Sequence, residues 1–264
     1  MPEPMIDIGV NLTDKRFAQD LDAVISRATE AGVSTLIVTG TSLAGSQAAR
    51  ELCHQHPGTL RFTAGVHPHH ASEYDAHTHA QLRQLALDPA CVALGETGLD
   101  FNRNFSSPTE QIAAFEQQLE LAMESGLPLF LHERDAHAEQ LALLKRHRSA
   151  ISRAVAHCFT GSEEELHGYL DLDLHIGLTG WVCDERRGAH LLPLLRDIPA
   201  DRLLLETDAP YLLPRDLRPK PKSGRNEPCY LPHIAERVAQ ATGEPVEVLR
   251  ARLHANSKAF FGLQ

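Results

Sequence analysis

The chain has 264 residues, of which 42% are hydrophobic and 23% are charged. This composition is ordinary for a soluble globular protein and excludes a disordered chain. The length suits a single (β/α)8 barrel, which needs roughly 250 residues, so we expect one domain over residues 1–264. The sequence shows neither a basic segment followed by an apolar run at its start nor a stretch of roughly 20 apolar residues, and we expect a cytoplasmic protein without membrane contact.

The charge and the cysteines narrow the possible partners and compartment. The chain carries 25 basic and 35 acidic residues, a net charge of −10, which opposes a polyanion-binding surface that covers the whole protein. Any nucleic acid must therefore be bound by a local basic face. The five cysteines are scattered and show no Cys-x-x-Cys spacing, which favours reduced, mostly buried thiols.

Short apolar runs rich in β-branched residues recur along the whole chain, and each is followed by a helical pattern. Near-continuous apolar strands that alternate with helices are typical of a parallel sheet. Eight such units without a linker favour a closed α/β barrel, the (β/α)8 TIM barrel, over an open sheet. The predicted strands are 5–9, 34–39, 60–66, 91–95, 128–132, 153–157, 173–178 and 202–206.

Two helices carry clear start signals. Ser107 is a candidate N-cap, Pro108 stands at the first helical position, and Glu110 completes a capping box; Gly126 should end this helix. "GSEEEL", from 161 to 166, repeats the same device. After the last strand we expect a Pro-rich loop over 214–228 and helices near 231–242 and 246–260.

Imidazoles and carboxylates gather where the predicted strands end. In a (β/α)8 barrel the chemistry lies at the carboxyl ends of the strands, where the loops begin. These types are metal ligands, and a divalent cation would relieve the repulsion between the clustered acids. The strand-end residues are Asp7 and Asn11, His67, His69 and His70, Glu96 and Asp100, His132 with Glu133, Arg134 and Asp135, then His157, and Glu206 with Asp208.

We predict a divalent cation held by four of these side chains: Glu96, His132, His157 and Asp208. Mixed nitrogen and carboxylate ligands suit zinc, manganese or iron, and with added waters they allow magnesium. Such an ion lowers the pKa of bound water and polarises a phosphoryl or carbonyl oxygen, and Asp208 is the natural base. Glu206 either interacts with one of the metal-ligating side chains, without binding the metal itself, or pairs with an arginine.

Six motifs resemble the TatD family of metal-dependent deoxyribonucleases, and the resemblance covers almost the entire chain. They are "GVHPH", "GETGLDFNRN", "LHERDA", "HCFTG", "GLTGWVCDERRG" and "ETDAPYLLPRDLRPKPKSGRNEP". The resemblance implies a (β/α)8 barrel that removes nucleotides from the 3′ end of single-stranded DNA and RNA with magnesium. It also implies that Glu96, His132, His157 and Asp208 bind metal, that Asp208 activates water, and that His67 faces the scissile phosphate.

One stretch departs from the family pattern. Many members begin with Asp-x-His-x-His, whose histidines hold a second metal, whereas this chain has Asp7, Gly9 and Asn11 at those positions. We therefore expect one tight metal site and at most a weak second one. Magnesium is the expected ion, with manganese or zinc as alternatives. Asp7, together with Glu206, is expected behind the ligands, and Asn11 with His69 at the substrate.

Basic residues fall where the strand-end loops should lie. They are Arg103 and Arg134, then Arg215, Lys220, Lys222 and Arg225 in the Pro-rich loop, and we expect all six to bind substrate. Such a local face binds a polyanion despite the net charge. Phe101, Phe105, Trp181 and Tyr211 are candidates to stack on unpaired bases.

The sequence thus predicts a monomeric metal-dependent 3′-5′ exonuclease that binds the 3′ end of single-stranded DNA or RNA. Two alternatives stay open. One is a metal-dependent hydrolase of amide or ester bonds, including the aminoacyl ester on tRNA, because the same metal-bound water attacks carbonyl centres. The other is a non-catalytic nucleic-acid-binding protein, which the missing strand-one histidines would explain.

Overall fold

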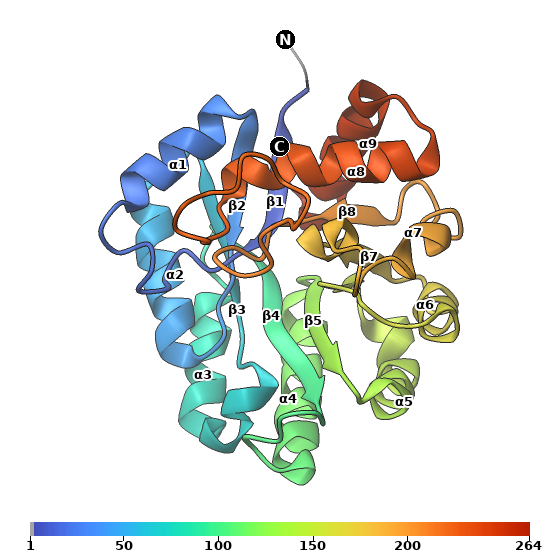
Figure 1. The fold of residues 1–264 in the computed structure, drawn as a ribbon. Coiled ribbons are helices and arrows are strands. Elements are labelled where there is room, and N and C mark those ends of the chain that lie inside the picture. Colours follow the sequence, from blue (N-terminus) through green and yellow to red (C-terminus); the bar gives the residue numbers. More distant parts are fainter. Residues whose placement is uncertain (1–2) are drawn as a thin grey trace. The chain divides into compact units, whose positions relative to one another are not determined.

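The computed structural model describes residues 3–264, which form two compact units (Figure 1). The first unit comprises Met1–Val38, Cys158–Leu166 and Ile176–Gln264, and the second comprises Thr39–His157 and His167–His175. The single domain expected over 1–264 stays a prediction. Within residues 3–264, no helix is both long enough and apolar enough to cross a bilayer.

The first unit is built on parallel strand pairs. β1 (Met5–Val10) pairs with β2 (Val33–Val38), and β7 (His175–Leu178) pairs with β8 (Leu203–Leu205). The segment after β8 is hydrogen-bonded to β1, because the N–H of Asp208 donates to the carbonyl of Gly9 over 2.9 Å. The end of β8 is therefore fixed against the end of β1.

Helices cover these strands. α9 (Val246–Phe261) packs on β1 and β8, and α8 (Leu231–Thr242) lies beside α9 (Figure 1). Both helices end at a glycine in the left-handed region, Gly243 at φ 75° and Gly262 at φ 66°. The remaining elements here are α1 (Leu21–Glu30), η3 (Gly180–Cys183), α7 (Leu191–Leu194) and η4 (Pro228–Tyr230), where η marks a 3-10 helix. α6 (Glu163–Leu170) belongs to this unit up to Leu166.

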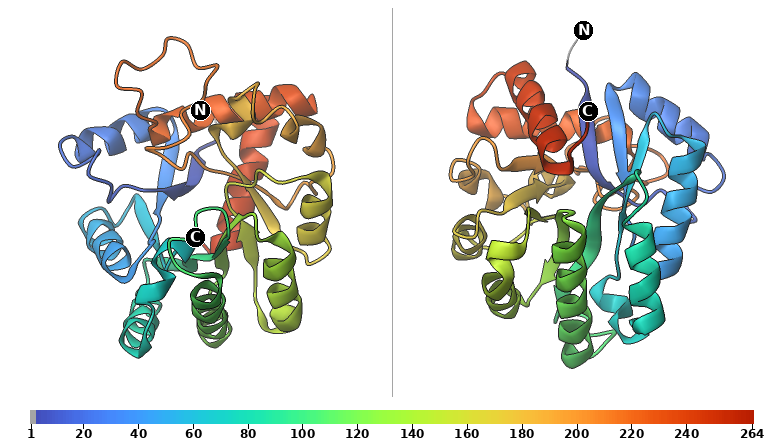
Figure 2. Two further views of the ribbon diagram at one scale, coloured as in Figure 1. Left: turned by 60° about the horizontal axis from the view of Figure 1, so that its bottom comes forward. Right: turned by 180° about the vertical axis from the view of Figure 1, so that it is seen from behind.

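The second unit holds four parallel strands in sequence order. They are β3 (Leu60–Ala64), β4 (Cys91–Asp100), β5 (Leu129–Arg134) and β6 (Ala154–Ala156). Its helices are α2 (Leu43–Gln55), η1 (Pro68–Glu73), α3 (Ala76–Leu85), α4 (Pro108–Ser125), α5 (His137–His147) and η2 (Arg148–Ala150). Figure 2 shows α2, α3 and α4 side by side, and α4 packs against β4.

Each strand lies where the apolar pattern predicted it, and the largest departure is β4. This strand was expected to stop at residue 95, yet it continues to Asp100 and is buried along its whole length. The extension pairs with β5 after a register shift between Leu94 and Thr97. The apolar run could not reveal it, because four of the five added residues are polar or glycine, with Leu99 the exception, and the extension is held by strand pairing rather than by hydrophobicity alone.

Gly95 makes this irregularity in β4 possible. Its φ of 143° is a backbone conformation that side-chain-bearing residues rarely adopt, and a Cβ there would lie 2.2 Å from the carbonyl oxygen of Phe130. The next residue, Glu96, donates its backbone N–H to the carbonyl of Gly40 over 2.7 Å. The glycine therefore positions the residue on which the candidate active site depends.

Both predicted capping boxes are confirmed. The N–H of Ser107 donates to the carboxylate of Glu110 over 2.7 Å, and the N–H of Glu110 donates back to the Ser107 hydroxyl, so α4 begins at Pro108. Ser162 and Glu165 make the same reciprocal pair at the start of α6. Local sequence signals were sufficient for these helix starts because their partners lie three residues apart.

Replacement of Gly95 by alanine should lower the free energy of unfolding by more than about 2 kcal/mol, because strain and a backbone clash occur together. Gly126→Ala is the matched control: its φ of 72° also disfavours alanine, but the added Cβ would meet nothing within 4 Å, so we expect a loss of about 1 kcal/mol. Urea unfolding followed by circular dichroism measures both. Equal losses would contradict the role of the Phe130 contact.

Candidate active site

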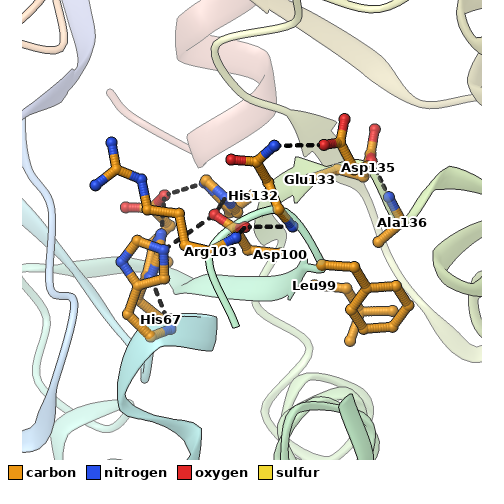
Figure 3. A network of polar contacts seen from close by, with 12 residues as sticks. His67, Leu99, Asp100, Arg103, His132, Glu133, Asp135 and Ala136 are labelled. Atoms are coloured by element: carbon orange, nitrogen blue, oxygen red, sulfur yellow. Dashed lines mark hydrogen bonds and ion pairs between the residues drawn. The ribbon is translucent and has the colours of Figure 1, made fainter. Parts of the chain in front are cut away.

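In the second unit, three imidazoles surround one carboxylate oxygen of Glu96. Its Oε1 lies 2.8 Å from His157 Nε2, 3.0 Å from His132 Nδ1 and 3.4 Å from His67 Nε2. The four residues come from β4, from β5 and from the positions after β3 and β6. Figure 3 shows His67 and His132 beside β4. The structure therefore brings together every predicted ligand of this unit.

Protonation in this cluster follows from burial and from the neighbouring charges. Burial opposes ionisation of Glu96, but the surrounding histidines outweigh it and hold the pKa of Glu96 well below its usual value. Burial likewise disfavours the cationic form of His132, yet its bonds to Asp100 and Glu96 prevail and raise the pKa of His132. Glu96 is therefore an ionised carboxylate, and its negative charge stabilises the protonated form of His132.

His67 differs from the other two imidazoles. Burial lowers its pKa to about 3, although the charge of Glu96 acts in the opposite direction, so His67 is neutral at pH 7. Its Nδ1 accepts the backbone N–H of His69 over 3.0 Å, and the ring proton therefore sits on Nε2. An Nε2–H group that points into the cluster can donate to an anionic oxygen.

Asp100 orients two of the histidines. Its Oδ2 lies 3.0 Å from His69 Nε2 and 3.2 Å from His132 Nε2, and its Oδ1 accepts the backbone N–H groups of Asn102 and Arg103. Burial opposes its charge, but these hydrogen bonds hold the pKa of Asp100 below its usual range. Asp100 thus fixes which nitrogen of His132 faces Glu96 (Figure 3).

The donors of this cluster fit a divalent metal ion. Glu96 Oε1 lies 3.0 Å from His132 Nδ1 and 2.8 Å from His157 Nε2, so one carboxylate and two imidazoles converge here, and Glu96 and His132 also belong to a group of potential ligand atoms within 4.8 Å of one another. Imidazole nitrogens with a carboxylate oxygen are the ligands of zinc and manganese, and magnesium accepts them when waters fill the remaining positions. The residues present are therefore suited to the metal that the sequence predicted, and the identity of the ion is left open by the donor set.

The first unit holds the other predicted site residues after β1 and β8. The half-buried Asp208 has a positive φ of 51°, and its Oδ1 accepts a hydrogen bond from Asn11 Nδ2 over 2.9 Å. Asn11 also donates its backbone N–H to the carbonyl of Ala209 over 2.7 Å. Asn11, which was expected to bind substrate, therefore holds the Asp208 carboxylate.

Asp7 and Glu206, which were expected behind the ligands, are both fully buried. Asp7 is fully buried and accepts the backbone N–H and the hydroxyl of Thr207. Burial and the charge of Glu206 raise the pKa of Asp7 to about 8, against the effect of those bonds. Glu206 accepts the backbone N–H of Cys158 over 2.6 Å. Thr207, next to Asp208, is thereby fixed.

The two basic residues of the second unit that were expected to bind substrate lie after β4 and at the end of β5. Arg103 and Arg134 are exposed, and Arg103 lies beside the network in Figure 3. Phe105 is 66% exposed, and its ring meets the edge of the His69 ring with centroids 4.8 Å apart. An exposed aromatic ring next to a histidine of the cluster can stack on a base.

The segment 215–225, here called the basic loop, is fixed at both ends within the first unit. At its start, Asp216 Oδ1 lies 2.7 Å from His233 Nε2 on α8, and Arg215 lies 3.7 Å from Asp184. At its end, Arg225 makes two bonds to Asp20 and one to Glu227. Between these anchors Lys220 and Lys222 are exposed, and Figure 2 shows the orange segment extending away from the helices.

The sequence placed Asp100 among the strand-end residues but gave it no role, and it did not single out Asn226. Asp100 lies four residues after Glu96 on β4, so the two side chains face the same side of the strand, and this period of two is the signal that links Asp100 to the Glu96 cluster. Asn226 donates to the carbonyl of Thr207 over 2.9 Å, but no local pattern announces a contact across nineteen residues.

Comparison with known sequences gives one consistent answer. The model of the family described as TatD related DNase matches residues 6–262. A protein of Erwinia amylovora, named 3'-5' ssDNA/RNA exonuclease TatD, is 56% identical over 98% of this chain and 100% of its own length.

Comparison with solved structures confirms the fold. A TatD family hydrolase from Entamoeba histolytica is 27% identical, covers 100% of both chains and gives a TM-score of 0.90. YJJV, a TatD homologue from Escherichia coli, is 27% identical over 98% of each chain with a TM-score of 0.89. The predicted (β/α)8 TIM barrel of the amidohydrolase type is thus correct. The chain belongs to the TatD family of DNases.

Proposed function

We propose that the chain is a metal-dependent hydrolase that removes nucleotides from the 3′ end of single-stranded DNA and RNA. The observation that carries this proposal is the Glu96 carboxylate surrounded by His67, His132 and His157. The 56% identity to a protein named as a 3'-5' ssDNA/RNA exonuclease supports the choice of substrate. We further propose that residues 1–264 act as one catalytic domain, as a monomer in the cytoplasm.

The metal of this site would be held by Glu96, His132, His157 and Asp208. Magnesium is the proposed ion, with manganese or zinc as alternatives that the nitrogen-rich donors also suit; one site is tight and a second, if present, is weak because Gly9 has no side chain. When bound, such an ion lowers the pKa of a bound water and polarises a phosphoryl oxygen. His132 must release a proton from Nδ1 when a metal binds there.

The protein's own residues then have separate tasks. The carboxylate of Asp208 accepts a proton from the attacking water, and the hydrogen bond from Asn11 Nδ2 to its Oδ1 orients this carboxylate. His67 donates its Nε2–H to an oxygen of the scissile phosphate, since its Nδ1 is engaged by the backbone of His69. Asp100 keeps His69 and His132 in orientation, and Asp7 holds Thr207 in place.

The substrate is bound by a local basic face. Lys220 and Lys222 are exposed on the basic loop, and Arg103, Arg134 and Arg215 are exposed near strand ends. These cations would bind phosphates, while Phe105 and Tyr211, which are 66% and 48% exposed, would stack on unpaired bases. The guanidinium of Arg225 is held by Asp20 and Glu227, so its part in binding is to keep the loop in place.

Purified protein with Mg²⁺ should shorten a 5′-labelled single-stranded oligonucleotide stepwise from its 3′ end, and a chelator should stop the reaction. Glu96→Gln should slow it at least about 1000-fold, because the loss of a charged ligand removes several kcal/mol of stabilisation. Product ladders on denaturing gels measure the rate. Glu124→Gln, an exposed partner of Arg83, is the matched control and should keep full activity.

An oligonucleotide that stays intact with magnesium, manganese and zinc would overturn this function. Assays with an amide or ester substrate, including aminoacyl-tRNA, would then test the carbonyl alternative with the same protein.

Asp208→Asn should reduce turnover by about 10²–10⁴-fold, because an amide cannot accept the proton of the water. The fold should survive, since the amide oxygen of the variant can still accept the hydrogen bond from Asn11. Single-turnover cleavage of the labelled oligonucleotide measures this. Asp201→Asn, whose side chain is 71% exposed, serves as control. If Asp208→Asn were as active as the parent, Asp208 would not be the base.

Lys220→Ala with Lys222→Ala should weaken binding of single-stranded DNA and flatten its salt dependence. Each lost phosphate contact removes about 0.7 from the slope of log K against log salt, so the slope should fall by about 1.4. Fluorescence anisotropy in the Asp208→Asn background measures this without cleavage. Glu244→Ala, on the α8–α9 connection, is a charge-changing control and should leave the slope unchanged. A double variant with the parent slope would refute the role of the loop.

A further inference from the structure

A second cluster of potential ligands lies in the first unit, at the start of the basic loop. It consists of Cys183 at the end of η3, Asp216 in the loop and His233 in the first turn of α8. One ligand atom from each residue lies within 4.8 Å of the others. Cys183 is buried, while the side chains of Asp216 and His233 are 34% and 27% exposed. The cluster is thus covered on the cysteine side and open to solvent on the other.

The donors of this cluster are a thiol, an imidazole and a carboxylate. Sulfur and nitrogen donors with one carboxylate oxygen are ligands of Zn²⁺, and a set of three leaves the fourth tetrahedral position for water. Zinc bonds of about 2.0–2.3 Å separate neighbouring donors by roughly 3.3–3.8 Å. Asp216 Oδ1 and His233 Nε2, now 2.7 Å apart, would only have to separate by less than about 1 Å.

The surrounding structure holds the ligands in place. η3 is capped by Thr179, whose hydroxyl accepts the N–H of Trp181 over 3.2 Å, and α8 packs against η3. Arg237, one turn beyond His233 on α8, acts electrostatically on Cys183 in the direction that favours the thiolate, whereas burial and Asp216 favour the thiol. Zinc would displace the thiol proton, and thiolate and carboxylate would offset its two charges.

An ordinary ion pair between Asp216 and His233 would account for two of the three residues. It leaves out the sulfur of Cys183. The thiol interacts with the Asp216 carboxylate through a weak side-chain hydrogen bond, and replacement of the thiol proton by zinc would turn this weak contact into a strong thiolate bond.

We propose that Cys183, Asp216 and His233 form a second metal site, which takes Zn²⁺ and ties the basic loop to η3 and α8. This site differs in kind from the Glu96 cluster, whose recorded donors are imidazole and carboxylate, because it contains sulfur. The effect of this zinc is to fix the loop that carries Lys220 and Lys222. The proposal does not depend on the nuclease function.

The sulfur ligand allows a test without an activity assay. The full chain is stripped of metal by a chelator and titrated with Co²⁺, which occupies zinc sites and shows an intense near-ultraviolet charge-transfer band only when a thiolate is bound. We expect this band in the parent protein. Cys183→Ser should lose it, whereas Cys229→Ser, which removes a half-buried cysteine outside the cluster, should keep it.

His233→Gln provides the second variant, since its partly exposed side chain can change without opening the core. This variant should bind Co²⁺ at least about tenfold more weakly, as measured by titration of the charge-transfer band. Circular dichroism checks that each variant is folded, and if Cys183→Ser does not fold, the His233→Gln titration decides. The proposal is overturned if the parent shows no band, if the band persists in Cys183→Ser, or if His233→Gln binds Co²⁺ as the parent does.

Discussion

The candidate active site depends on one buried negative charge, the carboxylate of Glu96. A carboxylate in this position would be costly unless positive or hydrogen-bonding groups surrounded it, and three imidazoles do so within 3.4 Å of a single oxygen. Two of the imidazoles differ in their tendency to carry a proton: the hydrogen bonds to Asp100 and Glu96 raise the pKa of His132, whereas burial keeps His67 neutral. One charge thus gives its neighbours distinct chemical tasks.

The backbone places this charge as much as the side chains do. Gly95 permits the irregularity in β4 before Glu96, and the strand then continues to Asp100, so both acids stand on one face of one strand. In the first unit, Asp208 likewise has an unusual backbone conformation, which is held by Gly9 and by the fixed neighbour Thr207. In both units, the positions of the reactive side chains are therefore fixed by the backbone conformation and hydrogen bonds of the segments that carry them.

The sequence was most informative where partners are near in the chain or where a pattern repeats. It predicted the strands, the two capping boxes and the proximity of Glu96, His132 and His157, because apolar period and strand-end position are local properties. It did not reveal that Arg225 is bound by Asp20, 205 residues away, or that Asn11 holds Asp208. Such pairings form only when distant segments meet in the folded chain. The sequence around a charged loop residue is the same whether its side chain forms an ion pair or is solvated.

The double anchoring of the basic loop has a consequence for how the protein tolerates damage. The contact of Asp216 with His233 holds one end of the loop, and the contact of Arg225 with Asp20 holds the other. The stretch between these two contacts is therefore not needed to keep either end in place. A protease cut there would leave both cut ends attached to folded helices. The cleaved chain should therefore stay folded and lose only the phosphate binding that Lys220 and Lys222 provide.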